Sequence, residues 1–210
     1  MVLLDYEVLE CLVNKTFFFD AMKKYLIFIF TIVLSISAIA QEVLSVKGIP
    51  VHGSVDVFVK QMKQKGLKRI KSSFNTSTIF LEGDFMSRNA VFVILPDDDE
   101  NVCKVSVTFD EQSSWHMLES IYYDCKRLYT EKYGNPIVWE EKIEDDVYKY
   151  ENMLLGLHQG LITYNTFYLV GNGSIGIRMV PIGKTKGAVM ILYENHKTMI
   201  KQIMKDLDDI

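Results

Sequence analysis

An acidic run is the first part of this chain whose residue types could carry out chemistry. A glycosidase needs two carboxylates about 5 to 10 Å apart across a cleft, one as acid and one as base or nucleophile. The run could supply one of the two, if a second carboxylate faces it. The alternative, which we favour, is an exposed hairpin tip whose charge discourages pairing with other strands. The run consists of Glu140, Glu141, Glu144, Asp145 and Asp146.

A glycine pattern at Gly171–Gly176, with the letters GNGSIG, matches the phosphate loop of dinucleotide-binding proteins. That site needs a helix after the loop, so that the pyrophosphate meets a helix N-terminus. An alternating strand pattern follows here instead. We therefore predict a two-residue hairpin turn at Asn172-Gly173, with positive φ at both residues, and we expect no cofactor.

The histidines, cysteines and clustered carboxylates do not have the spacing of a metal site or of a catalytic nucleophile with its base. Zinc sites show tight local pairs of Cys or His, and consecutive carboxylates such as those at 97–100 cannot converge on one calcium ion. We expect no metal and no catalytic residues. The four histidines are His52, His116, His158 and His196.

Tyrosine and arginine residues are the remaining candidates for binding, because both are favoured at interface hot spots. Strand alternation separates Tyr164 and Tyr168 from the apolar pair Phe167 and Leu169. If the apolar residues pack on helices, the tyrosines face solvent on the open side of a sheet. The alternative, that they only brace one another, stays open. The predicted binding residues are Tyr148, Tyr150, Tyr164, Tyr168 and Arg178.

The elements that would position these residues follow from periodicity and from cap and turn residues. Helices are predicted from Ser54 to Gly66, from Ser113 or Ser114 to Lys132 or Tyr133, and from Lys197 to Leu207. Strands are predicted at Leu67–Phe74, Thr78–Phe85, Ala90–Leu95, Val102–Phe109, Ile137–Ile143, Val147–Leu155, Leu161–Val170, Ser174–Ile182 and Ala188–Tyr193.

This order is a helix followed by a strand meander, given twice, and then a final helix. It predicts an α+β fold with an antiparallel sheet and helices on one face, because strands joined by short turns are not parallel neighbours. We expect one domain at 41–210 that contains two repeats, at about 46–110 and 111–195.

A leader precedes that domain. Residues 22–40 combine two lysines, an apolar stretch and the small-residue sequence Ala38-Ile39-Ala40, which is typical of a cleaved signal peptide. The acidic residues 1–21 do not suit such a leader, and we interpret them as a start-site artefact. The mature chain is therefore expected to be exported, periplasmic or extracellular, with no stable membrane span after cleavage.

The charge of the chain bounds its partners. The formal net charge is −4, with 23 basic and 27 acidic residues, and no basic cluster is visible. Binding to nucleic acid needs such a cluster to neutralise phosphates, so we expect no nucleic acid partner. In an exported protein Cys103 and Cys125 could form a disulfide, but each also suits a buried thiol, and both alternatives stay open.

The element order, with Lys132-Tyr133-Gly134-Asn135-Pro136 ending the second helix, resembles exported bacterial proteins of the beta-lactamase-inhibitor-protein-like type. The segments Phe80–Phe85 and Ile191–Asn195 are similar to segments in secreted proteins of Bacteroides-like bacteria. The resemblance covers residues 46–210. It implies tandem repeats that form one curved sheet, and binding through the concave face of that sheet.

Together these observations predict an exported, non-catalytic binding protein that recognises a protein or an envelope component through an open sheet face. The alternative is a periplasmic hydrolase of glycans that uses carboxylates near 140–146, and a third possibility is a structural protein of the envelope. Enzymatic activity is the less favoured of these interpretations.

Overall fold

The computed structural model of this chain describes residues 43–70, 77–144 and 152–200. The chain divides into two compact units, Met1–Gln41 and Glu42–Ile210, and every described residue belongs to the second. Several predicted features lie outside the described residues: the segment 1–21, the signal peptide at 22–40, Asp145, Asp146, Tyr148 and Tyr150.

The elements match most of the predicted ones. The helices are α2 (Val55–Gln64), α3 (Trp115–Tyr133) and α4 (Met153–His158), and residues 196–200 are also helical. The strands are β1 (Ser45–Val46), β2 (Ile49–Pro50), β3 (Lys68–Ile70), β4 (Ile79–Phe85), β5 (Arg88–Pro96), β6 (Val102–Phe109), β7 (Val138–Ile143), β8 (Ile162–Val170), β9 (Gly173–Ile182) and β10 (Lys186–Asn195).

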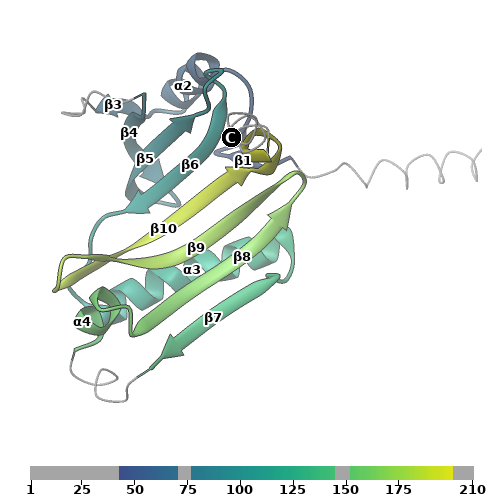
Figure 1. The fold of residues 1–210 in the computed structure, drawn as a ribbon. Coiled ribbons are helices and arrows are strands. Elements are labelled where there is room, and N and C mark those ends of the chain that lie inside the picture. Colours follow the sequence, from purple (N-terminus) through teal and green to yellow (C-terminus); the bar gives the residue numbers. More distant parts are fainter. Residues whose placement is uncertain (1–42, 71–76, 145–151, 201–210) are drawn as a thin grey trace, which may run out of the picture. The chain divides into compact units, whose positions relative to one another are not determined.

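Eight of these strands form one antiparallel sheet in the order β3-β4-β5-β6-β10-β9-β8-β7, and β1 pairs with β2 in a separate hairpin. Consecutive strands are neighbours within each half, and β6 pairs with β10 at the centre (Figure 1). The predicted α+β class with an antiparallel sheet is therefore confirmed.

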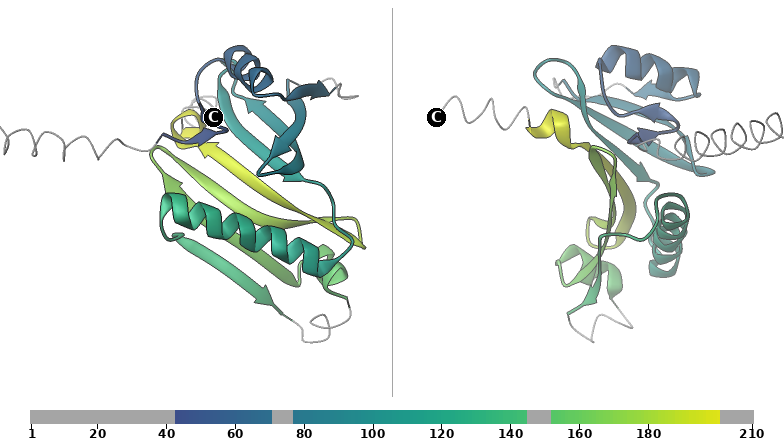
Figure 2. Two further views of the ribbon diagram at one scale, coloured as in Figure 1. Left: turned by 180° about the vertical axis from the view of Figure 1, so that it is seen from behind. Right: turned by 90° about the vertical axis from the view of Figure 1, so that its right-hand side faces the viewer.

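Helix α3 has both of the predicted end residues. The side chain of Ser114 accepts a hydrogen bond from the backbone N–H of Met117 at 3.5 Å, and Gly134 follows the last turn with a φ of 81°. A hydroxyl at the N-cap and a glycine just past the end satisfy backbone groups that the helix leaves free. Helices α2 and α3 lie on the same side of the sheet (Figure 2).

The face beneath α3 contains the core. One residue from each of six adjacent strands forms a row across it, and every member is fully buried, at 0 % exposure. The registers of the five strand pairs place these residues directly opposite one another. They are Thr166, Ile177, Ile191, Val107, Phe92 and Leu81. A single apolar layer thus joins the two halves of the sheet.

Two predicted local structures are wrong. The segment predicted as a strand at Val147–Leu155 contains the start of helix α4, because a short apolar run does not by itself distinguish a helix from a strand. The hairpin turn predicted at Asn172-Gly173 lies one residue earlier, since Val170 pairs with Gly173 and only Gly171 has a positive φ, of 56°.

Candidate binding face

Tyr164 and Tyr168 do not lie on the open side of the sheet, as predicted, but beneath α3, where they are 7 % and 1 % exposed. The reason is the register of β8 and β9, which places Tyr168 opposite Ile175 and Phe167 opposite Gly176. Tyr168 therefore shares a face with buried aliphatic residues. Alternation separates two strand faces but does not say which of them is buried.

The hydroxyls of these tyrosines are bound to α3 rather than free for a partner. Tyr168 donates a hydrogen bond to the backbone carbonyl of Lys126 at 3.0 Å, and its hydroxyl lies 2.9 Å from that of Thr130. Tyr164 donates to the carboxylate of Glu119 at 3.2 Å. Burial raises the pKa of both phenols, so both stay protonated and can act as these donors. Their role is to fasten α3 to the sheet.

We call the sheet face opposite α3 the open face. Arg178 lies on it, as predicted, directly opposite Asn165 on the neighbouring strand. The guanidinium carbon of Arg178 is 5.9 Å from the ring centre of Phe167, within range of a cation–π contact. The Nε atom of Arg178 is buried and has no hydrogen-bond partner among the described residues. An unpaired buried donor costs free energy, and a hydrogen-bond acceptor that reached the guanidinium would offset that cost.

The phenyl ring of Phe167 packs over Gly176, which has no side chain to block it. A Cβ atom at Gly176 would lie 2.9 Å from Cε1 of Phe167, which is closer than side chains approach. The missing side chain therefore lets the phenyl ring lie across β9, next to Arg178. Strand alternation in the sequence places Gly176 on the same face as Arg178, but it assigns Phe167 to the core. Only the pairing of the two strands shows this contact.

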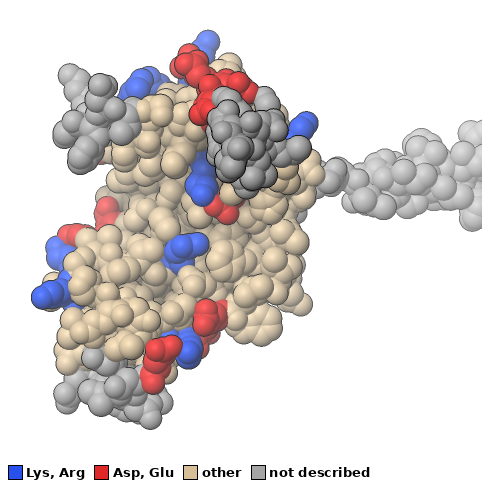
Figure 3. Space-filling model, in the orientation of Figure 1, with Lys and Arg blue, Asp and Glu red and all other residues tan. Residues whose placement is uncertain are grey.

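A row of apolar side chains continues from Phe167 across the open face. We call it the apolar row, and in strand order it contains Val138, Phe167, Leu192, Val93, Phe80 and Ile70. Gly176 and Ser106 occupy the two intervening strands. In Figure 3 this side of the molecule is largely free of charged groups, with isolated acids and bases.

Polar groups border the apolar row. On one side Lys104 and Glu194 form an ion pair of 2.6 Å between β6 and β10. On the other side a hollow of about 410 Å³ includes Lys68, Glu82 and Asp84 among its lining residues. Leu169, at 58 % exposure, stands on the same face beyond Phe167. An apolar centre with a polar rim is the usual composition of a protein interface.

Two of the carboxylates predicted for a hydrolase lie within strand β7 and point away from each other. Glu140 and Glu141 are neighbours on strand β7, so their side chains lie on opposite faces of the sheet. Glu141 is bound on the α3 side by Lys126, and by Tyr123 at 3.1 Å. Glu144 pairs with Lys142 at 2.7 Å. Within the described residues the run therefore offers no pair of carboxylates across a cleft.

Cys103 and Cys125 are separate thiols and are not joined in a disulfide. Cys125 is buried on α3, whereas Cys103 is half-buried at the start of β6, beside an irregularity in the pairing of β5 and β6. Burial raises the pKa of Cys125 to about 12 and also raises that of Cys103. Thiols with raised pKa values are poor nucleophiles.

Comparisons with protein-family models, with curated proteins and with solved structures found no match to this chain. The beta-lactamase-inhibitor-protein-like resemblance accordingly stays a prediction. No helix among the described residues is long and apolar enough to cross a membrane.

Proposed function

We propose that this chain is an exported binding protein that docks a protein of the cell envelope or its surroundings on the open face. Its partner presents an apolar surface to the apolar row and a carboxylate to Arg178. Export is inferred from the leader at 22–40, and docking is inferred from the side chains of the open face.

The observation that carries the proposal is the state of Arg178. A guanidinium binds a carboxylate strongly, because charge-assisted hydrogen bonds are about twice as strong as neutral ones. Here Nε is buried without a partner beside the ring of Phe167. Arg178 as a whole is only half-buried, so a shift of its side chain would let a partner carboxylate reach the guanidinium. Surrounding apolar contacts would then exclude water from the bond, as at interface hot spots.

The dimensions favour a macromolecule over a small ligand. Eight strands spaced by about 4.8 Å carry the apolar row over roughly 34 Å. The row contains large side chains on several strands instead of a single concave site. Extended, uncharged patches of this kind mark interaction surfaces on otherwise polar proteins.

The test is photo-crosslinking in the source cells with a benzophenone amino acid at Leu169 on the open face. The matched control carries the same group at Met117, which is exposed on α3. We expect one saturable partner to be captured from position 169 and not from position 117. The partner is then purified for affinity measurements with the variants below.

Arg178→Met keeps the length of the side chain and removes its charge, while Arg127→Met makes the same change on α3, where Arg127 has an exposed side chain. We expect Arg178→Met to weaken binding by about tenfold or more, and Arg127→Met to leave it unchanged. Equal capture at both crosslinking positions, or an unchanged affinity of Arg178→Met, would contradict docking on this face.

A further inference from the structure

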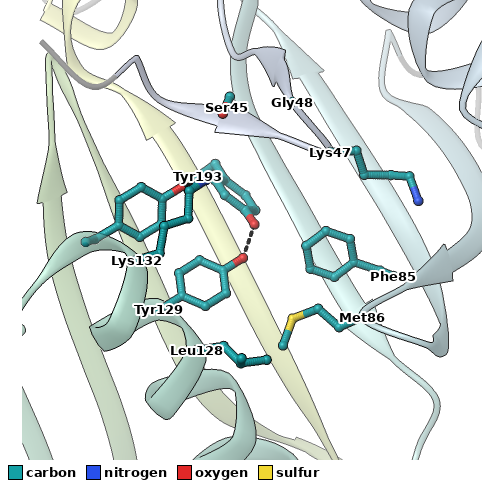
Figure 4. A pocket seen from close by; sticks show the side chains of 10 residues that line it. Ser45, Lys47, Gly48, Phe85, Met86, Leu128, Tyr129, Lys132 and Tyr193 are labelled. Carbon is teal, nitrogen blue, oxygen red and sulfur yellow. Dashed lines mark hydrogen bonds between the residues drawn. The ribbon is translucent and has the colours of Figure 1, made fainter. Parts of the chain in front are cut away.

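A second site lies on the other side of the sheet, between the C-terminal half of α3 and the β1–β2 hairpin. It is a cavity of about 240 Å³, and Figure 4 shows its walls. Its lining residues come from β1 and the turn after it, from the end of β4 and the turn after it, from α3 and from β10. They are Ser45, Lys47, Gly48, Phe85, Met86, Leu128, Tyr129, Lys132, Tyr133 and Tyr193. We call this cavity the tyrosine pocket.

Two tight hairpin turns border the tyrosine pocket, and both place an ordinary side chain in the left-handed backbone region. Lys47 and Gly48 have φ values of 51° and 77°, while Met86 and Ser87 have values of 51° and 60°. Such turns prefer Asn and Gly, because other side chains are strained there. Lys47 also donates a hydrogen bond to the backbone carbonyl of Asp84 at 2.7 Å, which ties the two hairpins together.

Three of these four turn residues, Lys47, Gly48 and Met86, line the cavity. Met86 extends its thioether toward the ring of Tyr129 (Figure 4), and Lys47 contributes to the rim. Unfavourable backbone geometry that surrounds a cavity is characteristic of binding sites, where it holds a side chain in place before the ligand arrives.

Three phenols line the pocket. The hydroxyl of Tyr133 accepts a hydrogen bond from Nζ of Lys132 at 2.8 Å, so the other two phenols carry the argument. The hydroxyls of Tyr129 and Tyr193 are hydrogen-bonded to each other (Figure 4), and both residues are buried. One hydroxyl donates to the other, so the accepting hydroxyl keeps a proton that no described residue accepts. Burial raises the pKa of both phenols, and they remain neutral donors. The free proton therefore calls for an acceptor oxygen.

The charged residues that line the pocket favour an acceptor that carries a negative charge. Two of the ten lining residues are lysines, Lys47 and Lys132, and none is acidic. Phe85, Met86 and Leu128 supply apolar walls. The volume is slightly below the roughly 300 Å³ at which pockets for drug-sized ligands begin, which sets the ligand at about ten non-hydrogen atoms.

We propose that the tyrosine pocket binds a small carboxylate with an apolar body, its oxygen accepting the free hydroxyl proton of the Tyr129–Tyr193 pair. The apolar body lies against Phe85, Met86 and Leu128, and the two lysines attract the negative charge. This site is independent of docking on the open face, so either function can fail without the other.

Octanoate is the probe, and titration calorimetry on the full chain is the measurement. We expect one octanoate per chain with a Kd at or below about 1 mM, the affinity that ten ligand atoms provide at ordinary ligand efficiency. Octylammonium has the same body and the opposite charge, and it should bind at least about tenfold more weakly because of the lysines.

Variants locate the site. The double variant Tyr129→Phe/Tyr193→Phe removes both hydroxyls and keeps both rings, whereas either single change would leave the other hydroxyl with a free proton. It should weaken octanoate binding by about tenfold. Leu128→Trp should abolish binding by filling the cavity from its rim, where Leu128 is 39 % exposed. Tyr123→Phe, on α3 but outside the pocket, is the control and should change affinity by less than about twofold.

Three outcomes would overturn the proposal. One is the absence of octanoate binding to the folded protein at concentrations about ten times the expected Kd. Another is equal binding of octylammonium. The third is an unchanged affinity of the double variant Tyr129→Phe/Tyr193→Phe and of Leu128→Trp, which would place octanoate elsewhere.

Discussion

Individual tyrosines fasten helix α3 to the sheet through their hydroxyl groups. Tyr168 binds the backbone of the helix, and Tyr122 reaches back from the helix to Thr166 at 2.5 Å. Rings pack beside these bonds, with Tyr122 and Tyr164 edge to face at a centroid distance of 5.3 Å. Each residue thus combines the burial of a large ring with a satisfied polar group, which is the favourable way to place tyrosine in a core.

Tyr168→Ala should lower the free energy of unfolding by about 3 to 5 kcal/mol, because it leaves a large cavity beneath α3. Tyr168→Phe should cost only about 1 kcal/mol, since it removes the hydrogen bond but keeps the ring. Urea unfolding of the full chain measures both. Leu169→Ala is the control on the adjacent, exposed position and should cost less than about 1 kcal/mol. Equal costs at 168 and 169 would refute the assignment of the two strand faces.

The buried phenols also predict the response of the fold to alkali. Burial raises the pKa values of Tyr122, Tyr129, Tyr164 and Tyr193 above those of the unfolded chain. The native state then holds protons that the unfolded state releases, so stability is complete below about pH 10 and falls as the pH rises further.

The measurement is urea unfolding at several pH values on both sides of the ordinary tyrosine pKa, combined with ultraviolet absorbance of tyrosinate. We expect the buried phenols to ionise together with unfolding, in one step. A gradual rise in tyrosinate absorbance without loss of helical circular dichroism would mean that water reaches these hydroxyls in the native state.

At the scale of elements, turns and caps decide where strands and helices end. The turn between β4 and β5 consists of Met86 and Ser87, both left-handed. Ser87→Gly should raise the free energy of unfolding by about 0.5 kcal/mol, because relief of the left-handed strain exceeds the added entropy of the unfolded chain. Thermal unfolding of this variant tests the turn geometry, and a clear loss of stability would show that the turn is of another type.

The α+β class and the ends of α3 are the parts of the fold that the sequence could predict. Ser114 and Gly134 mark the ends of α3 because their side chain and backbone properties act locally. The faces of β8 and β9 could not be predicted, because they depend on which strand residue stands opposite which. The contact of Phe167 with Gly176 arises from that register alone. The sequence therefore predicted Arg178 on the open face. It placed Tyr164 and Tyr168 on that face and Phe167 in the core, whereas the structure has the reverse arrangement.

At the scale of the molecule, the pairing of β6 with β10 makes the two halves of the sheet one structure. The core is a single cluster that runs from residues of α2 to residues of β8 and β9. A continuous core unfolds cooperatively. We therefore expect the unit Glu42–Ile210 to unfold in one transition.

Native-state hydrogen exchange measures this cooperativity. Amides of β5 and of β9, one strand in each half, should exchange at the same free energy of opening, because neither half can open without exposing the shared core. Ile191→Ala, at the centre of the sheet, should lower both values by the same amount, within about 0.5 kcal/mol. A lower value for β5 alone would mean that the first half opens by itself.

The position of β10 also determines when, during synthesis, the sheet can be assembled. It is the last strand in sequence among the described residues, yet it lies in the middle of the sheet, between β6 and β9. While the chain is being made, a ribosome that has not yet passed residue 195 leaves β6 and β9 with bare edges, which are prone to pair with other chains. Assembly of the sheet must wait for β10, so the edges of β6 and β9 stay open to pairing with other strands until β10 has been made.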